Sequence, residues 1–265
     1  MRIVVLIKQV PETKSVKMDE ETGTVIREGV EAIVNPLDLY AIETAISLKD
    51  EYGGETVAVS MGPPKADICI KEALSMGVDK GVLISDRAFA GSDTWATSYI
   101  LGEAIKILGD VDMIICGERA TDGDTGQVGP EVAAHLRLPV ASYVNKIYSI
   151  SDGKISLSRQ VEQGDELLDV NLPCLLTVVK EIATPRLPTL DGKIRAKATQ
   201  LDMVTADMLQ LNSDFIGLKG SPTRVAKIFR PKVTRECELI FGKDDAAIHD
   251  GVEKVYAFLD SREVL

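Results

Sequence analysis

The sequence has 265 residues, of which 45% are hydrophobic and 27% are charged, and its formal net charge is −11. This acidic balance argues against nucleic acid as a partner, because phosphate binding requires a basic surface. The apolar run at residues 3–7 stops at Lys8 and is too short for a signal peptide, and no run approaches the ~20 apolar residues of a membrane helix. We therefore predict a cytoplasmic protein that does not insert into membranes.

Few residues suit hydrolytic catalysis or metal binding. The four cysteines form no CxxC pair, and the chain has only two histidines, so a catalytic triad or a zinc site has little support. The residues concerned are Cys69, Cys116, Cys174, Cys237, His135 and His249. We expect the cysteines to be structural, and we predict neither a catalytic residue nor a metal site.

The first half of the chain predicts strands that alternate with helices. Residues 2–10 are rich in β-branched side chains and predict a buried strand, and residues 12–29 predict a small hairpin with its turn at 19–24. Asn35 is a good N-cap, and Pro36 suits the first position of a helix that ends near Tyr52. Further strands are expected at 55–61, 78–85 and 111–116, and further helices at 65–76, 93–108 and 131–138.

This alternation predicts an α/β fold with an open, mainly parallel sheet, helices on both faces and the capacity to bind an adenine nucleotide. Ligands of such sheets gather beyond the carboxyl ends of the strands. Residues 8–11, 61–62, 85–86 and 117–129 are then expected to surround one crevice.

The glycine-rich segment 117–130 follows a predicted strand and precedes a helix. Pro130 is tolerated only in the first turn, so the helix is expected to start between Gly126 and Gly129. The free amides of a helix amino terminus can bind a phosphate where glycines let it approach. Alternatively, the glycines serve turns, and Asp124 or Thr125 caps the helix. The segment matches neither the P-loop nor the GxGxxG spacing.

The pattern changes after Pro139. Strands are predicted at 140–150, 154–161, 166–172 and 174–179, with hairpin turns at Asp152-Gly153 and Gly164-Asp165, as antiparallel additions to the sheet. Residues 183–193 predict a loop, residues from about 194 predict an extended tail without a core of its own, and residues 244–260 predict a final helix. The expected organisation is an α/β domain at 1–183, a loop at 184–198 and a carboxyl-terminal arm at 199–265.

Several segments together resemble the beta subunit of electron transfer flavoproteins over nearly the whole chain. The resemblance rests on 7–10, Asn35-Pro36, Glu43, Ala45, Leu48-Lys49, 59–63, 73–79, 117–130, Pro185-Arg186 and Thr189-Leu190. It implies that the chain pairs with an alpha subunit, which the arm at 199–265 embraces, and that it holds an adenine nucleotide in its crevice.

The resemblance also implies which residues bind the nucleotide. They are Leu6, Lys8, Asn35, Pro36, Leu37, Asp38, Ser60, Met61, Gly62, Ala120, Thr121, Asp122, Gly123, Asp124, Thr125, Gly126, Gln127, Val128, Gly129 and Val132. Because carboxylates repel phosphates, we expect Asp122 and Asp124 to face ribose hydroxyls or loop amides. The segment 184–198 matches the family's recognition loop for a partner dehydrogenase, with docking residues Pro185, Arg186, Thr189, Leu190 and Arg195; Leu190 is the anchor unless its side chain folds back onto the domain.

The residues at Gly123, Asp124 and Thr125, followed by 127–130, look like those of members that bind a second FAD and bifurcate electrons. The implied activity is oxidation of NADH by this FAD. One electron passes to a low-potential acceptor such as ferredoxin, and the other passes through the alpha-subunit FAD to an acyl-CoA or hydroxy-acid dehydrogenase. One alternative is a simple electron carrier with structural AMP in the same site. Another is a nucleotide-sensing α/β module without a redox role.

Overall fold

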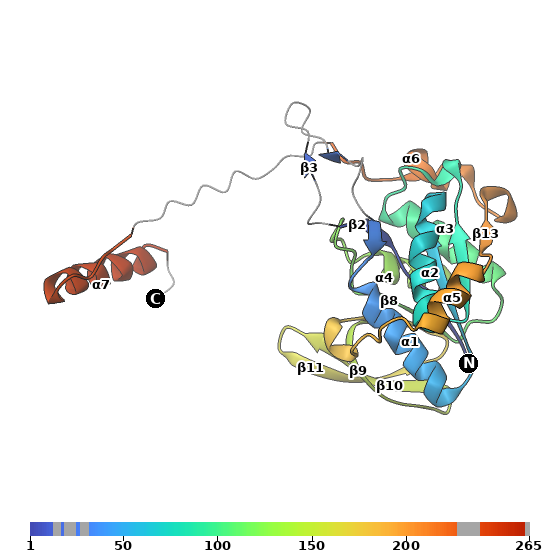
Figure 1. Ribbon diagram of the computed structural model, residues 1–265, viewed down its shortest axis with the longest axis horizontal. Coiled ribbons are helices and arrows are strands. Elements are labelled where there is room, and N and C mark those ends of the chain that lie inside the picture. The colour runs from blue at the N-terminus through green and yellow to red at the C-terminus, as the bar shows by residue number, and fades with distance from the viewer. Residues whose placement is uncertain (13–16, 19–24, 27–31, 227–238, 263–265) are drawn as a thin grey trace. The chain divides into compact units, whose positions relative to one another are not determined.

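The computed structural model describes residues 1–12, 17–18, 25–26, 32–226 and 239–262. The chain forms two compact units, Met1–Ile228 and Phe229–Leu265. The first unit contains the large sheet and the helices that cover it, and the second contains α7 (Asp245–Asp260) (Figure 1). Within the described ranges, no helix combines the length and apolar character needed to cross a bilayer.

The main sheet of the first unit contains nine described strands in the order β11-β10-β9-β12-β8-β1-β6-β7-β13. Their bounds are β1 (Arg2–Leu6), β6 (Glu55–Met61), β7 (Lys80–Ile84), β8 (Met113–Gly117), β9 (Val140–Ser151), β10 (Lys154–Val161), β11 (Gly164–Asn171), β12 (Cys174–Val178) and β13 (Asp202–Val204). All neighbours from β9 to β13 along this order pair in parallel, whereas β10 pairs antiparallel with both β9 and β11. The predicted mainly parallel sheet with an antiparallel addition is therefore confirmed for β9–β11, whereas β12, also predicted as an antiparallel addition, pairs in parallel with β8 and β9.

Strand β1 is an interior strand of the sheet, and helices cover both of its faces. Ile3 and Val5 pack into one core cluster with side chains of α1 (Asp38–Tyr52) and α2 (Asp67–Met76). Val4 and Leu6 pack into a second cluster with side chains of α3 (Thr94–Ile107) and α4 (Val128–Leu136). Each fully buried aliphatic side chain contributes about 1.5–3 kcal/mol, so alternate residues of one strand stabilise both helical layers.

Several shorter elements complete the first unit. Strand β2 (Gln9–Pro11) pairs with β5 (Ala32–Val34), and β3 (Lys17–Met18) pairs with β4 (Val25–Ile26), as the predicted hairpin requires. The turn predicted at 19–24 lies outside the described residues. Short 3₁₀ turns occur at Pro64–Ala66, Arg87–Phe89, Lys180–Ile182, Ala206–Met208 and Ser213–Phe215, and α6 spans Gly217–Gly220.

Two predictions for the first 40 residues of the chain are wrong. The strand predicted over 2–10 is divided, because the Lys8 amide leaves the ladder and donates to Asp38 Oδ2 at 2.7 Å. Asn35 is not the N-cap of α1, which begins at Asp38 after Leu37, because the Asn35 side chain is engaged in contacts described below. Further along, the β10–β11 turn precedes Gly164 rather than containing it, since β11 already begins there.

The segment predicted as a loop and a coreless tail is more ordered than expected. Helix α5 (Leu190–Ala198) begins within the predicted loop and packs beside α2, with Ala196 buried in the first core cluster. Strand β13 then joins the sheet beside β7, so residues up to 226 belong to the first unit. The final helix is confirmed as α7, whose N-cap Asp244 accepts a hydrogen bond from the Ala247 amide at 2.9 Å.

Candidate functional site

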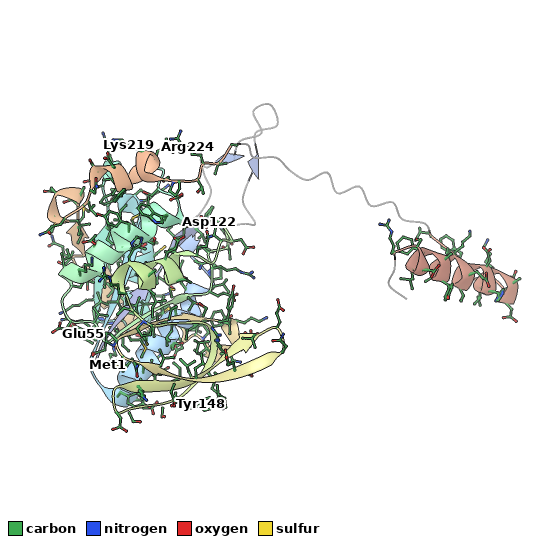
Figure 2. The ribbon with its side chains drawn as sticks, turned by 180° about the vertical axis from the view of Figure 1, so that it is seen from behind. Met1, Glu55, Asp122, Tyr148, Lys219 and Arg224 are labelled. Atoms are coloured by element: carbon green, nitrogen blue, oxygen red, sulfur yellow. The ribbon has the colours of Figure 1, made fainter. Side chains whose placement is uncertain are left out.

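The order of the strands places a topological switch point beside β1. The chain proceeds from β1 outward through β6 and β7, and β8 then returns to the other side of β1. Open α/β sheets bind ligands beyond the carboxyl ends of their strands at such a point. Asp122, which follows β8, lies at the edge of the unit opposite Met1 and Glu55, where β1 and β6 begin (Figure 2).

The fully buried Asn35 connects two segments at this edge. Its Nδ2 donates to Asp38 Oδ1 and to the Arg119 carbonyl, both at 2.9 Å. Its Oδ1 accepts from the Thr121 amide at 3.1 Å. One side chain therefore holds the backbone of the loop after β8 against the turn before α1.

Asp38 joins the carboxyl ends of β1 and β8. Burial raises the pKa of Asp38 to about 7, although hydrogen bonds from Asn35 and from the Lys8 and Gly117 amides oppose this shift. A Cβ atom at Gly117 would lie 2.6 Å from Asp38 Oδ1, so only glycine allows this close approach. The ends of the two central strands are thus fixed to each other through a carboxyl group.

The acidic residues of the loop are paired with cations. Lys8 Nζ lies 2.7 Å from Asp122 Oδ1, and Arg119 Nε lies 3.1 Å from Asp124 Oδ1. These carboxylates thus pair with side-chain cations rather than with loop amides, and their contact with ribose hydroxyls stays a prediction. Asp124 and Gly126 have φ angles of 54° and 63°, a left-handed conformation that turns the loop sharply before α4.

Ser60, near the carboxyl end of β6, carries a buried hydroxyl group without a partner. The residue is 1% exposed, and its Oγ forms no hydrogen bond with any described residue. The neighbouring Val59 carbonyl accepts from the Ile7 amide at 2.9 Å, so Ser60 lies beside the segment that follows β1. An unsatisfied buried hydroxyl costs about 1–3 kcal/mol, which suggests that a group outside the chain completes it.

The amino terminus of α4 also has unused donors. The helix starts at Val128, within the predicted range, and its N-cap Gln127 forms no side-chain capping bond. Neither Asp124 nor Thr125 caps it, so the capping part of the alternative is wrong, whereas Gly126, with its φ of 63°, does serve a turn. Among the described residues, the amides of Thr125, Gly126 and Gln127 donate to no protein acceptor. These amides and the helix dipole together favour an anionic ligand.

Gly129 explains how α4 reaches its position. A Cβ atom there would lie 2.8 Å from both Cys116 Sγ and Thr177 Cγ2, so the first turn of the helix rests directly on β8 and β12. By contrast, a Cβ atom at Gly123 would meet no heavy atom within 4 Å. The loop therefore combines a rigid base with an open tip.

The structure brings many of the predicted cofactor-binding residues together. Hydrogen bonds link Lys8, Asn35, Asp38, Thr121 and Asp122. The predicted residues Ser60, Met61 and Gly62 lie at the carboxyl end of β6, and the Gly62 amide donates to the Ile84 carbonyl at 3.0 Å.

Other predicted residues occupy different surroundings. Leu6, Gly129 and Val132 are buried, and Val132 is fully enclosed in the second core cluster. Pro36 and 121–125 are exposed, whereas Leu37, Ala120, Gly126 and Val128 are half-buried. Sequence reasoning did not single out Arg119, whose backbone carbonyl accepts from Asn35. A carbonyl group is common to every residue type, so the sequence gives no signal for it.

The predicted docking segment is held on the surface of the first unit. Arg186 forms ion pairs with Glu43 and Asp50 of α1 at 2.9 and 3.1 Å. Thr189 Oγ1 caps α5 by accepting from the Gly192 amide at 2.9 Å, and Arg195 Nη2 donates to the Leu74 carbonyl at 2.8 Å. Leu190, at the first position of α5, remains 75% exposed and does not fold back onto the domain.

The remaining candidate groups do not form a second reactive centre among the described residues. Cys69, Cys116 and Cys174 are buried and free, and burial raises the pKa of Cys69 and Cys174 to about 12. His135 packs edge-on against Trp95 with ring centroids 5.6 Å apart. No group of acidic, histidine or cysteine residues suited to a metal occurs in the described ranges, and Cys237 lies outside them.

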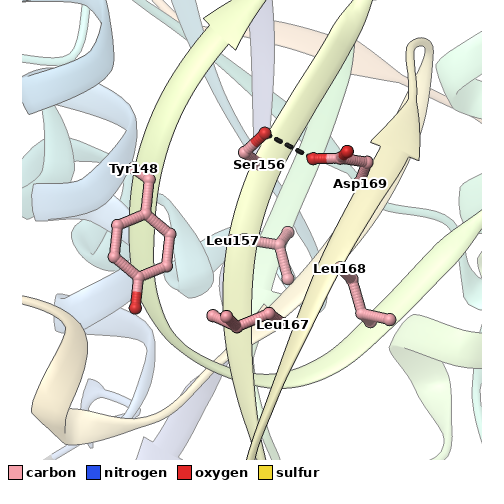
Figure 3. Close-up of a pocket in the computed structure, with 6 residues that line it drawn as sticks. All are labelled: Tyr148, Ser156, Leu157, Leu167, Leu168 and Asp169. Carbon is pink, nitrogen blue, oxygen red and sulfur yellow. Dashed lines mark hydrogen bonds between the residues drawn. The ribbon is translucent and has the colours of Figure 1, made fainter.

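A cavity of about 400 Å³ lies on the antiparallel strands (Figure 3). It is lined by Tyr148, Ser156, Leu157, Leu167, Leu168 and Asp169. Ser156 Oγ donates to Asp169 Oδ1 at 2.5 Å across its wall. None of the predicted site residues lines this cavity, so it is separate from the switch point.

Comparison with known proteins gives consistent relatives. The model of the electron transfer flavoprotein domain matches residues 22–207. The electron transfer flavoprotein subunit beta of Thermoanaerobacterium thermosaccharolyticum is 42% identical over 266 residues that cover 100% of both chains. The caffeyl-CoA reductase-Etf complex subunit CarD of Acetobacterium woodii is 45% identical over 91% of this chain and 92% of its own. Protein FixA of Azotobacter vinelandii is 44% identical over 92% of this chain and 89% of its own. Full-length similarity and the α/β sheet agree, and the chain belongs to the beta-subunit family of electron transfer flavoproteins.

Proposed function

We propose that this chain pairs with an alpha subunit and binds FAD at the carboxyl ends of β1, β6 and β8. The observation that carries the proposal is the junction of the 118–127 loop with α4, where the amides of 125–127 have no protein acceptor among the described residues. Donors at a helix amino terminus suit the pyrophosphate of a dinucleotide. The buried Ser60 hydroxyl beside the same edge supports the proposal independently.

The residues of the chain divide the work of binding. The amides of 125–127 and the start of α4 would hold the phosphates, and Ser60 Oγ would form a hydrogen bond with the ligand. Lys8 and Arg119 offset the charges of Asp122 and Asp124, which lowers the repulsion between these carboxylates and a phosphate. The open tip at Gly123 leaves space for a ligand longer than AMP.

We further propose that the complex takes electrons from NADH and divides them between a low-potential acceptor, such as ferredoxin, and a dehydrogenase reached through the alpha subunit. The bound flavin supplies the hydride and single-electron chemistry, and the chain supplies binding and orientation. The names of two relatives, the CarD subunit of a caffeyl-CoA reductase-Etf complex and an acryloyl-CoA reductase electron transfer subunit, favour a dehydrogenase that acts on acyl-CoA substrates. A hydroxy-acid dehydrogenase is the alternative partner.

A simple electron carrier with AMP in the same site is the second candidate. The observation in its favour is that the free amides of 125–127 suit a single phosphate as well as a pyrophosphate. A nucleotide-sensing module without an alpha partner is a third candidate. The similarity of the whole chain to electron transfer flavoprotein subunits argues against it.

The nucleotide content of the purified heterodimer tests these proposals. The complex is denatured by heat, and the released nucleotides are separated and counted per heterodimer. Two FAD molecules are expected. One FAD with one AMP would overturn the bifurcating assignment. A chain that copurifies with no alpha subunit and stays colourless in the presence of FAD would overturn the flavoprotein assignment.

A further inference from the structure

Glu43 holds the start of the segment that carries the exposed Leu190. Both Glu43 carboxylate oxygens accept from Arg186: Oε2 from the backbone amide and from Nε at 2.9 Å each, and Oε1 from Nη2 at 2.9 Å. The Glu43 side chain is only 9% exposed. Asp50, two turns later on α1, receives Nη1 of the same guanidinium at 3.1 Å. Arg186 is therefore fixed in backbone and side chain alike.

The shifts in pKa agree with an ion pair between Glu43 and Arg186. Burial alone would raise the pKa of Glu43, but hydrogen bonds from Arg186 and Ser47 outweigh it and hold the pKa below its ordinary value. The hydrogen bonds with Glu43 and Asp50 raise the pKa of Arg186. Bidentate arginine–carboxylate pairs are both stronger and more directional than single ion pairs. The pair thus sets an orientation as well as a position.

The other end of the segment is fixed against α2. A Cβ atom at Gly192 would lie 2.2 Å from the Ser75 carbonyl oxygen, so the backbone of α5 rests directly on the end of α2. Arg195 Nη2 donates to the Leu74 and Val78 carbonyls at 2.8 and 3.2 Å. The helix can therefore shift little relative to the sheet.

Between these two attachments lie three exposed apolar side chains. Leu187, Leu190 and Ile194 are 85%, 75% and 60% exposed. Leu190 and Ile194 are four residues apart on α5 and share one helical face. The exposed Lys193 and Lys197 lie on the same helix, in a chain whose net charge is −11. The exposed Asp191 also lies on this helix, next to Leu190, so the border of the patch is mainly but not wholly basic. An apolar patch with such a border fits a partner with an apolar pocket and a mainly acidic rim.

We propose that Glu43 is a positioning residue, which holds Arg186 so that Leu187, Leu190 and Ile194 form a preset docking surface for the electron-accepting dehydrogenase. A segment that is already ordered loses less conformational entropy on docking, and the complex forms at a lower dehydrogenase concentration. This inference rests on the proposed function, because its partner is the dehydrogenase of that proposal, and it takes the docking role of 184–198 from the family resemblance.

The test uses Glu43→Gln in the assembled heterodimer, with the purified dehydrogenase as the varied acceptor. The expected result is a rise of about 10-fold in the KM for the dehydrogenase, with kcat and flavin content within about 2-fold of the parent values. Faster amide hydrogen exchange over 185–195 is expected in the free heterodimer. Glu103→Gln is the matched control, because Glu103 pairs with Lys106 on α3 and should leave KM unchanged.

Two further variants separate the possible failures. Leu190→Ala should raise KM whatever Glu43 does. An unchanged KM in Leu190→Ala would remove the docking role that the resemblance implies for 184–198 and would leave the proposed FAD binding standing. A raised KM in Leu190→Ala with an unchanged KM in Glu43→Gln would overturn only the positioning role. If Glu43→Gln does not fold, Asp50→Asn decides, because Asp50 is exposed. A rise of about 2-fold supports the proposal and no rise overturns it.

Discussion

Two segments of the first unit lead into helices. One leaves hydrogen-bonding groups without a protein partner, and the other exposes apolar side chains. The loop before α4 keeps unused amides, and the unsatisfied Ser60 Oγ lies on β6, at the other side of β1 from the strand that leads into this loop. In the segment 186–195, Thr189 Oγ1 and the side chains of Arg186 and Arg195 bind other parts of the chain. The same segment exposes the apolar side chains of Leu187, Leu190 and Ile194. Unused hydrogen-bond donors suit a small polar ligand, whereas presented apolar groups suit a protein. A segment that leads into a helix can therefore bind either a small polar ligand or a protein.

Removing the contact that holds the first loop should have the largest effect. Asn35→Ala leaves the Arg119 carbonyl and the Thr121 amide without their partner and takes a hydrogen bond from Asp38. We expect a loss of about 4 kcal/mol in the free energy of unfolding and a loss of more than ~10-fold in FAD affinity. Chemical denaturation and flavin titration measure both quantities.

The matched control for this prediction is Asn145→Ala. Asn145 is half-buried on β9, where it contacts Asp165 and Ser158. We expect a loss of about 1 kcal/mol and unchanged FAD affinity. Equal effects of the two substitutions on FAD affinity would mean that Asn35 does not organise the ligand site.

The pH dependence of stability should reveal Asp38. Because burial raises the pKa of Asp38 to about 7 in the folded state, above the ordinary value near 4, the folded state favours the protonated carboxyl group. The protonated Asp38 therefore stabilises the folded state fully below pH 4. As the pH rises from 4 toward 7, the free energy of unfolding falls by about 1 kcal/mol per pH unit. Asp38→Asn cannot ionise, so the difference between parent and variant should change with this slope. A constant difference from pH 4 to pH 7 would exclude the raised pKa.

A pair of glycine substitutions tests whether the crowded end of β8 at Gly117 and the open tip of the first loop at Gly123 differ in their tolerance of a side chain. Gly117→Ala places a methyl group 2.6 Å from Asp38 Oδ1 and should cost about 2 kcal/mol. Gly123→Ala meets no neighbouring atom and should change the free energy of unfolding by less than about 0.5 kcal/mol. Thermal unfolding of both variants makes the comparison, and equal losses would contradict a rigid base with an open tip.

The smallest expected effect concerns the Ser60 hydroxyl. Ser60→Ala removes a buried group without a protein partner, so the ligand-free chain should keep or gain stability while FAD affinity falls about 5-fold. Ser75→Ala is the control, because Ser75 Oγ already donates to the Glu72 carbonyl at 2.7 Å. A loss of stability in ligand-free Ser60→Ala would show that the hydroxyl has a role in the fold instead.

Much of the sheet could be predicted because its strands carry their own signal. The strands predicted at 55–61 and 154–161 coincide with β6 and β10. β-Branched and apolar residues dominate β6, whereas Ile155 and Leu157 alternate with polar residues in β10. Helix α5 was missed because it packs through the small residues Gly192 and Ala196 and exposes its larger apolar side chains. The three-residue strand β13 is too short to show a periodicity.

The site could be predicted only in part, for a related reason. The family resemblance selected Asn35, Asp38 and Ser60, but the sequence favoured a local capping role for Asn35. A local pattern cannot distinguish an N-cap from a side chain whose partners lie elsewhere in the chain. The pairing of Asp122 with Lys8 is equally non-local, since 114 residues separate them.

The dependence of the first loop on Asn35 has a consequence for engineering. The Asn35 side chain, which shapes this loop, lies 84 residues before Arg119 and 86 residues before Thr121 in the chain. Transplanting the glycine-rich segment alone into another α/β scaffold would carry over its sequence without its conformation. A working graft would have to include the 35–38 turn and a glycine at the position equivalent to Gly117.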